Sequence, residues 1–165
     1  MSNEQQTSAK HTATVTTPSD REIHVERIFD APRDLVFATL TDPELVPEWY
    51  GPHGGRTEVE VMEPRTGGLW RYHAESGDGD RHSFRGVYRE VTAPERFVQT
   101  WEWEGMPGYV CLETQSLEDL GEQTKLISTT IFFTTEERDG LLSTGMEDGM
   151  NETFERLDAL LESRK

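Results

Sequence analysis

Two histidines and three carboxylates lie within ten residues of one another, and side chains of these types bind metal ions: His73, Glu75, Asp78, Asp80 and His82. The segments on either side of the acidic turn alternate as strands do. Alternate side chains of a strand point to opposite faces of a sheet, and the pairing that fits this turn sends the two histidines to opposite faces. They could not then chelate one ion. We therefore expect no metal site, and we interpret the acidic turn as a solvent-exposed loop.

Four further side chains could carry proton transfer or nucleophilic chemistry. His53 follows the helix-ending segment 49–52 and could act as an acid or base at a cavity mouth, although we favour an exposed loop histidine. Glu90 and Gln99 are predicted to pair near the rim of the sheet, where the carboxylate could orient a ligand hydroxyl or lie in solvent. We favour solvent. Cys111 stands inside a strand-like run, and a lone cysteine there is ordinarily a small buried hydrophobe.

Sequence motifs for nucleophilic catalysis and nucleotide binding are absent from the chain. It contains no G-x-S-x-G elbow, no Walker loop and no G-x-G-x-x-G element. A Ser-His-Asp triad stays open, because its members can be distant in the sequence. The single cysteine excludes an intrachain disulfide and a cysteine-based zinc cage. We expect no catalytic set and no cofactor.

The charge balance excludes whole classes of partner. Sixteen basic residues against 32 acidic ones give a net charge of −16, which repels a nucleic-acid backbone and an anionic membrane surface. No apolar run is long enough to span a membrane, and residues 1–20 lack the apolar stretch of a signal peptide, so we expect a cytoplasmic protein. The Ser/Thr/Gln-rich composition predicts a disordered tail over 1–20, which leaves one domain over 21–165.

The remaining chain divides into a strand, two short helices, six strands and a long helix. Residues 21–29 alternate as a first strand. Asp30 can cap a short helix that Pro32 opens, and the start signal at 41–44 predicts a second short helix to about Tyr50. Six more strands are predicted at 56–62, 69–75, 82–91, 96–104, 109–117 and 124–133.

The last thirty residues read as a helix with one apolar stripe. Thr144 and Glu147 have the spacing of a capping box at its start. Strands joined by short turns favour an antiparallel meander, and helices segregated from such a sheet define the α+β class. The stripe follows a spacing of four, four, three and four residues: Met146, Met150, Phe154, Leu157 and Leu161.

The pairing of the strands can be predicted from the distribution of bulky side chains. A three-residue loop at 78–80 places Trp70 opposite Tyr88, and Tyr72 opposite Gly86, which gathers the aromatic side chains on one face. The next turn then sets Tyr88 beside Trp101. Gly86, in the middle of this face, is predicted to leave room where a side chain would fill space.

The sheet face that results carries six aromatic side chains, and the long helix offers three more apolar ones toward it. A solid core built from them is an open alternative to a cavity. We favour a cavity, because a glycine interrupts the face and methionines adapt to ligands. The predicted cavity residues are Trp70, Tyr72, Phe84, Tyr88, Trp101, Trp103, Met146, Met150 and Phe154.

An ordered series of short motifs resembles the SRPBCC (START-like, Bet v 1-like) superfamily, and within it the branch homologous to the activator of the heat-shock-protein-90 ATPase. The resemblance covers about residues 21 to 163, and no single motif decides it. The matching segments are 27–33 (RIFDAPR), 41–44 (TDPE), 49–52 (WYGP), 67–71 (GGLWR), 86–91 (GVYREV), 94–96 (PER), 105–108 (GMPG) and 145–149 (GMEDG).

The resemblance implies the helix-grip fold, in which about seven antiparallel strands curve around the last helix and two short helices follow the first strand. It also implies a ligand cavity between sheet and helix. It does not imply one activity, since such relatives include carriers, cyclases and co-chaperone domains.

Three functions remain, and the first is the one we predict. It is binding of a small apolar or aromatic molecule without turnover. The second is an enzyme of the cyclase or dehydratase kind that uses the same cavity. The third is a chaperone-regulating interaction domain, which the sequence does not support beyond the resemblance. A homodimer could form through a sheet edge or the Met-rich helix, although no residue demands it.

Overall fold

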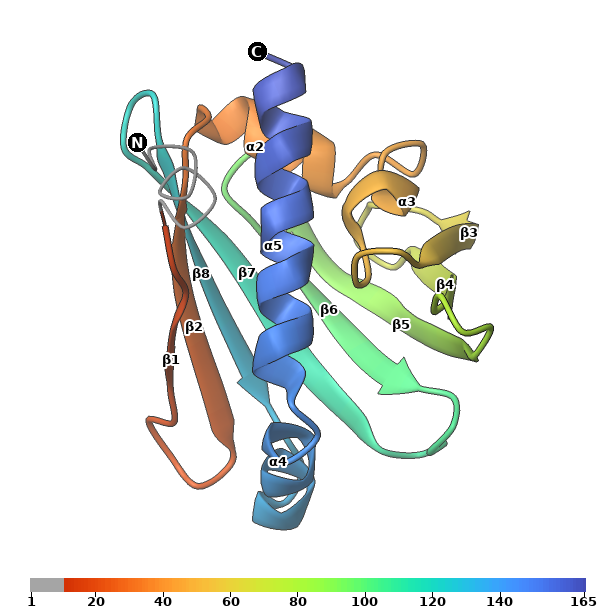
Figure 1. Cartoon of the computed structure of the whole chain (residues 1–165). Helices are drawn as coiled ribbons and strands as arrows, with labels where there is room; N and C mark the ends of the chain where they lie inside the picture. The colour runs from red at the N-terminus through yellow and green to blue at the C-terminus, as the bar shows by residue number, and fades with distance from the viewer. Residues whose placement is uncertain (1–10) are drawn as a thin grey trace, which may run out of the picture.

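A curved antiparallel sheet wraps around one long helix in the computed structural model, which describes residues 11–165 (Figure 1). The strand order is β1-β2-β8-β7-β6-β5-β4-β3, and the helix α5 runs along the concave face. The predicted α+β class and helix-grip fold are confirmed. The strands are β1 (Thr14–Thr16), β2 (Glu22–Phe29), β3 (Arg56–Met62), β4 (Leu69–Glu75), β5 (Arg81–Thr92), β6 (Arg96–Trp103), β7 (Val110–Asp119) and β8 (Thr124–Ile131).

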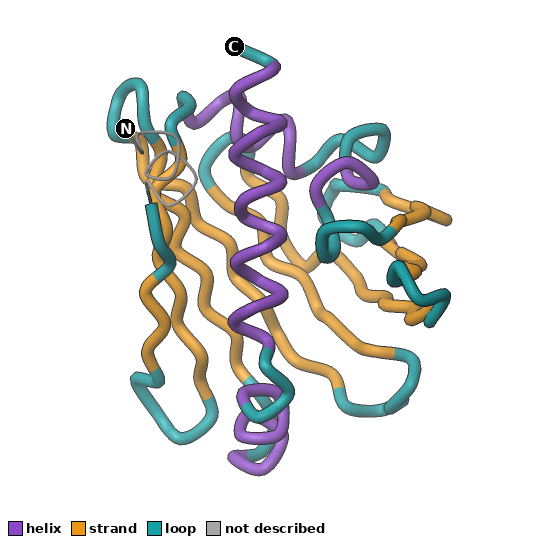
Figure 2. The backbone as a smooth tube through the Cα atoms, in the orientation of Figure 1, coloured by secondary structure: helices purple, strands orange, loops and turns teal. Residues whose placement is uncertain are grey.

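Four helices accompany the sheet in the described part of the chain: α2 (Arg33–Leu40), α3 (Val46–Trp49), α4 (Thr135–Leu142) and α5 (Met146–Ser163). The predicted single helix at the C-terminus is two helices, separated by a short turn (Figure 2). Gly145 takes a left-handed conformation with φ of 79°, which glycine adopts readily and which separates α4 from α5. None of the helices that the structure describes is long and apolar enough to cross a membrane.

The helix caps differ from the predicted ones. Thr144 does not cap α5; its hydroxyl donates to the carbonyl of Leu141. The capping box lies one helix earlier, where Thr134 accepts a hydrogen bond from the backbone N–H of Glu137 at 3.1 Å. Asp30 does not cap α2 either: the N-cap position is Pro32, which has no side-chain capping hydrogen bond, and Asp30 accepts a hydrogen bond from the side chain of Gln123.

Part of the segment predicted as a disordered tail forms a strand. Residues 14–16 pair with β2 and add an eighth strand at the edge of the sheet. Three residues with one half-buried valine give too weak an alternation to be recognised in the sequence. The first ten residues of the predicted tail lie outside the described residues.

The β4–β5 hairpin pairs two residues away from the predicted register. Trp70 lies opposite Gly86 and Tyr72 opposite Phe84, because the loop is five residues long rather than three. A shift of two residues keeps every side chain on its predicted face. The aromatic side chains of β4 therefore do face the helix, and the outward Arg71 pairs with Glu104 at 2.8 Å.

Gly86 does not leave empty space, and this prediction is wrong. The indole of Trp70 lies over the glycine and donates a hydrogen bond to the carbonyl of Thr100 at 3.2 Å. A Cβ at Gly86 would overlap both the indole and that carbonyl. The glycine is thus part of the packed core, in which Trp70 is only 1% exposed.

We expect Gly86→Ala to destabilise the protein by about 1–3 kcal/mol, the usual cost of overpacking a core. The added methyl group must displace either the Trp70 indole or the β6 backbone at Thr100. Urea unfolding measures the loss. Gly79→Ala is not a suitable control, because Gly79 has a positive φ; Gly140→Ala on α4, where a Cβ meets nothing, should leave stability unchanged or raise it. Equal effects of the two substitutions would contradict this packing.

Candidate functional site

A cavity of about 220 Å³ lies between the concave face of the sheet and α5. Its walls come from β2, β4–β8 and from the helices α2–α5. The lining residues are Ile23, Val25, Leu40, Trp49, Tyr50, Tyr72, Tyr88, Phe97, Gln99, Trp101, Glu113, Gln115, Leu126, Ser128, Thr130, Leu141, Met146, Met150, Phe154 and Leu157.

Six of the nine predicted cavity residues line this space, and three do not. Trp70 is buried over Gly86. Phe84 stacks on Trp101 from outside the cavity, with ring centroids 5.4 Å apart. Trp103 lines a second pocket beyond Trp101. The lining residues that the prediction named are Tyr72, Tyr88, Trp101, Met146, Met150 and Phe154.

Five polar side chains form a band across the floor of the cavity. Gln99 on β6 lies opposite Glu113 on β7, which lies opposite Thr130 on β8. In the adjacent row Gln115 lies opposite Ser128. We call these five residues the polar band. Apolar side chains flank it along the strands, so polar groups are collected at one level of an otherwise apolar interior.

Glu113 is the one carboxylate among the described residues that line the cavity. Burial raises the pKa of this carboxyl, and a hydrogen bond from the Gln99 amide, at 2.9 Å, lowers it in part. In the part of the chain that the structure describes, no lysine, arginine or histidine lines the cavity to hold a negative charge. Burial likewise raises the pKa of Tyr88 to about 12, and that of Tyr50 further. The interior therefore favours uncharged side chains.

We expect Glu113→Gln to be more stable than the natural protein at pH 7 and equally stable at about pH 4. The carboxyl has a higher pKa in the folded chain than its ordinary value of 4.5. As the pH rises past that value, the unfolded chain releases this proton first, so the folded state loses stability that glutamine cannot lose. Denaturant unfolding at both pH values checks it. A stability difference that is the same at both would contradict a buried, uncharged Glu113.

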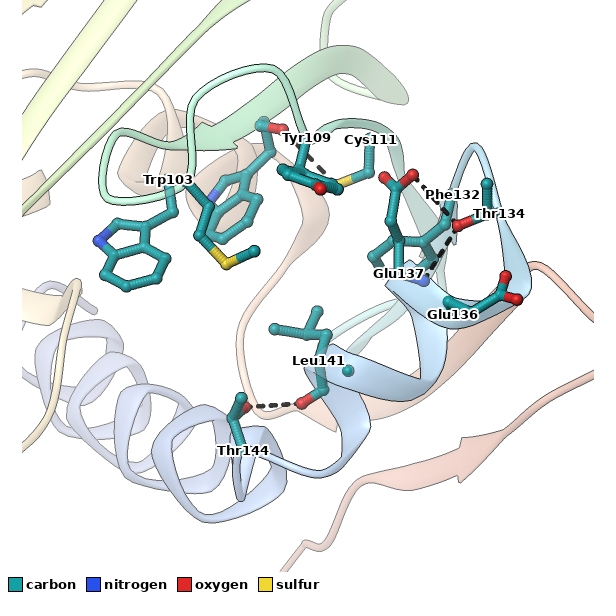
Figure 3. Close-up of a pocket in the computed structure, with 12 residues that line it drawn as sticks. Trp103, Tyr109, Cys111, Phe132, Thr134, Glu136, Glu137, Leu141 and Thr144 are labelled. Carbon is teal, nitrogen blue, oxygen red and sulfur yellow. Dashed lines mark hydrogen bonds between the residues drawn. The ribbon is translucent and has the colours of Figure 1, made fainter.

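A larger pocket of about 550 Å³ opens at the end of the cavity nearest α4 (Figure 3). Trp103, Tyr109 and Cys111 line one side of it, and Leu141 and Thr144 lie across from them. We call it the outer pocket. Its other lining residues are Trp101, Met106, Phe132, Thr134, Glu136, Glu137 and Gly140.

The outer pocket and the cavity share two side chains. Trp101 of β6 and Leu141 of α4 line both, so they form the boundary between the two spaces. Met106 and Tyr109, in the loop before β7, are about half exposed at the pocket. The polar band lies on the cavity side of this boundary.

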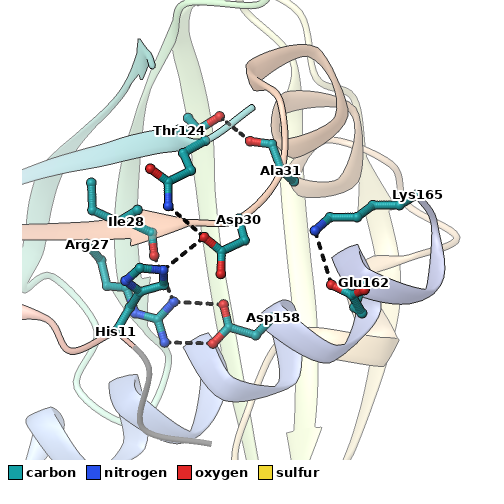
Figure 4. A network of polar contacts seen from close by, with 10 residues as sticks. His11, Arg27, Ile28, Asp30, Ala31, Thr124, Asp158, Glu162 and Lys165 are labelled. Atoms are coloured by element: carbon teal, nitrogen blue, oxygen red, sulfur yellow. Dashed lines mark hydrogen bonds and ion pairs between the residues drawn. The ribbon is translucent and has the colours of Figure 1, made fainter. Parts of the chain in front are cut away.

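An ion pair between a buried arginine and a partly exposed aspartate attaches α5 to the sheet. Arg27 on β2, which is 4% exposed, makes two hydrogen bonds of 2.7 Å to the carboxylate of Asp158 (Figure 4). Its guanidinium also lies 4.7 Å from the centre of the Phe29 ring. Arg156 fixes the other side of the helix by donating to the carbonyls of Tyr50 and Gly51. The helix α5, which covers the cavity, is thus attached to the rest of the domain on both of its sides.

The histidines that the sequence offered for chemistry lie away from the cavity. His53 is exposed and lies 3.2 Å from Glu155. His73 bonds to Glu60 and Ser83 on the outer face, whereas His82 contacts the ring of Trp103, so their predicted opposite orientation is confirmed. No group of three metal-binding side chains occurs in residues 11–165.

The predicted pairing of Glu90 with Gln99 is wrong. A β-bulge between Tyr88 and Glu90 inserts one residue into β5, which turns Glu90 to the outer face. There it pairs with Arg96 at 2.6 Å, while Gln99 pairs with Tyr88 and remains in the cavity. Cys111 is buried as predicted, and burial raises the pKa of its thiol well above the ordinary value.

Glu113 and its neighbours were missed, although the sequence contained a signal for them. Cys111 and Leu117 are apolar positions of the predicted strand 109–117, so alternation places Glu113 and Gln115 on the same inward face. The same holds for Ser128 beside Leu126. Polar residues at core-facing positions of adjacent strands indicate a cavity more directly than the aromatic residues do.

The described geometry can be compared with that of known proteins. The family described as "Activator of Hsp90 ATPase homolog 1-like protein" matches residues 30–162. The chain belongs to this family. It is therefore an AHSA-type domain of the SRPBCC, Bet v 1-like superfamily, as the motifs predict. No curated protein matches the chain.

Solved structures share the AHSA-type architecture over nearly the whole chain. A protein from Rhodobacter sphaeroides is 25% identical, with a TM-score of 0.84 over 93% of this chain and 99% of that one. A protein from Arthrobacter aurescens is 25% identical, with a TM-score of 0.83 over 91% of each. DynU16, a protein of the dynemicin biosynthetic locus, is 26% identical, with a TM-score of 0.68 over 90% of this chain and 49% of its own.

Proposed function

We propose that this AHSA-type domain binds a small, largely apolar molecule in the cavity beneath α5. The observation that carries the proposal is the polar band. Its five side chains lack a full set of hydrogen-bond partners among the described residues and line an interior that is otherwise apolar. Buried polar groups cost free energy unless they find partners, and a bound ligand or water supplies them. Ligand sites are typically apolar with a few such convergent groups.

The space available suits a molecule of one or two rings in the cavity, with room to extend into the outer pocket. The outer pocket, at about 550 Å³, is within the size range of known small-molecule sites, whereas the cavity of about 220 Å³ is smaller than that range and suits a compact ligand. The similarity to DynU16, which belongs to a biosynthetic locus, also supports a small-molecule ligand.

An NMR titration tests the proposal with three neutral bicyclic compounds: naphthalene, 2-ethylnaphthalene and 2-acetylnaphthalene. We expect saturable shifts at the Trp101 indole and the Met150 methyl, which both line the cavity. The exposed ring of Phe133 serves as a control that should not respond. If none of the three compounds shifts the cavity signals, the proposed function is wrong.

Glu113 favours a second function, which is proton transfer to a ligand held in the same cavity. A carboxyl with a raised pKa can act as a general acid near neutral pH. His53 and Glu90, the residues first considered for this role, lie outside the cavity. Turnover of a polyketide-like substrate that Glu113→Gln abolishes, while its binding persists, would establish the enzyme; binding without turnover excludes it for that compound.

A further inference from the structure

The two oxygens of the Glu113 carboxyl have different surroundings. One accepts the hydrogen bond from the Gln99 amide at 2.9 Å. The other has no hydrogen-bond partner among the described residues, and the side chain lines the cavity. If the carboxyl is neutral, its proton belongs on the oxygen that Gln99 does not occupy, because an amide N–H needs an acceptor. That O–H is a donor directed at the ligand space.

None of the described groups that face Glu113 carries a free positive charge that would favour its ionised form. Tyr50 beside α3, Tyr72 on β4 and Tyr88 on β5 are phenols with raised pKa values, and the thiol of Cys111 is also neutral. From β8 and α5 only Ser128, Thr130 and apolar side chains line the cavity. The buried guanidinium of Arg27 is committed to Asp158. On α4, Glu136 and Glu137 line the outer pocket and bring no positive charge toward Glu113.

We propose that the cavity selects a neutral molecule with a carbonyl group on an aromatic or alicyclic body, and that the carboxyl of Glu113 donates a hydrogen bond to this carbonyl. The inference rests on the proposed function. The apolar body lies toward Trp101 and Leu141, where the cavity meets the outer pocket. A carboxylate ligand is disfavoured, because no cationic side chain of residues 11–165 lines either space.

Four naphthalenes that differ in one substituent separate the ligand classes: 2-acetylnaphthalene (ketone), 2-ethylnaphthalene (no acceptor), 2-naphthoate (anion) and 2-(aminomethyl)naphthalene (cation). Dissociation constants are measured by fluorescence at pH 7. We expect the ketone to bind roughly 3- to 10-fold more tightly than the ethyl compound, the gain of one net hydrogen bond. We expect the anion to bind more weakly than the ethyl compound.

Variants assign the preference to Glu113. Glu113→Leu should reduce the ketone-to-ethyl ratio to about one, whereas Glu113→Gln, which keeps a donor, should preserve it. Glu118→Leu is the matched control, because Glu118 lies exposed on the same strand, and it should change nothing. The carbonyl stretching band of the bound ketone should shift to lower frequency in the natural protein and in Glu113→Gln only.

The outcomes distinguish this inference from the proposed function. Equal binding of ketone and ethyl compound overturns the inference and leaves the proposed function standing. Tightest binding of the cation also overturns it, since Glu113 would then act as a carboxylate. Binding of none of the four compounds overturns the function itself.

Discussion

Replacing Ser128 with leucine should weaken ligand binding strongly and at the same time stabilise the protein. Ser128 lies in the polar band, its hydroxyl makes no hydrogen bond to any described residue, and the cavity lies directly in front of it. A leucine side chain there fills part of a space of about 220 Å³. Cavity filling typically adds about 0.5–2 kcal/mol of stability. The same atoms exclude a ligand, so we expect binding to fall at least about tenfold, a loss of 1.4 kcal/mol or more.

Ser128→Leu is expected to lower the affinity for the ligand and to raise the stability of the fold, and these opposite effects make the substitution informative. Fluorescence titration with 2-acetylnaphthalene measures the binding, and thermal unfolding measures the stability. Ser116→Leu is the control, because it makes the same change on the outer face of the neighbouring strand, next to the inward Leu117. It should leave the affinity unchanged. A solid core would give the reverse result: Ser128→Leu would destabilise the fold by overpacking and would leave any surface binding intact.

Trp70→Ala should give the largest loss of stability of any substitution considered for this protein, about 3–5 kcal/mol. The indole is 1% exposed, lies over Gly86, packs at 4.7 Å between ring centroids against Tyr72, and donates to the Thr100 carbonyl. Because domains are stable by only about 5–15 kcal/mol, the variant should unfold at much lower urea concentration.

Trp103→Ala removes the same kind of side chain from a site outside the core. Comparing its loss of stability with that of Trp70→Ala shows how much of the loss comes from core packing. Trp103 is half-buried beside the outer pocket and contacts His82. We expect its removal to cost clearly less than that of Trp70 and to weaken only ligands that reach the outer pocket. Similar losses for the two tryptophans would contradict the assignment of Trp70 to the core and Trp103 to the pocket.

The order of elements could be predicted because each strand carries its own signal of alternation. The strands 56–62 and 69–75 were predicted at their observed bounds. The predicted sheet faces of β4 and β5 are correct although their pairing differs from the prediction by two residues. A shift by an even number of residues keeps each side chain on the same face of the sheet. The three-residue strand β1 is too short for its alternation to be recognised. The prediction merged α4 with α5 into one helix, although Thr134 and Glu137 have the spacing of a capping box at the start of α4.

Most of the apolar residues that the prediction assigned to the cavity line it, whereas the polar band on its floor was not predicted. Alternation correctly placed Tyr88 and Trp101 toward α5, but it could not show that Gly86 accommodates the Trp70 indole, which depends on the third dimension. The β5 bulge that moves Glu90 outward depends on cross-strand geometry in the same way. Glu113 could be predicted from the sequence, because its inward position follows from the inward positions of Cys111 and Leu117 on the same strand. The prediction used only the bulky side chains and therefore missed this carboxylate.

The most direct test of a ligand cavity beneath α5 is to locate a bound compound by intermolecular nuclear Overhauser effects. With 2-acetylnaphthalene bound to protein carrying labelled methyl groups, we predict contacts from the ring protons to the methyls of Met150 and Leu157, both on the helix side of the cavity. Contacts should weaken in Ser128→Leu. Contacts confined to exposed side chains such as Ile131 or Val110, with none to the α5 methyls, would show that the interior takes no ligand.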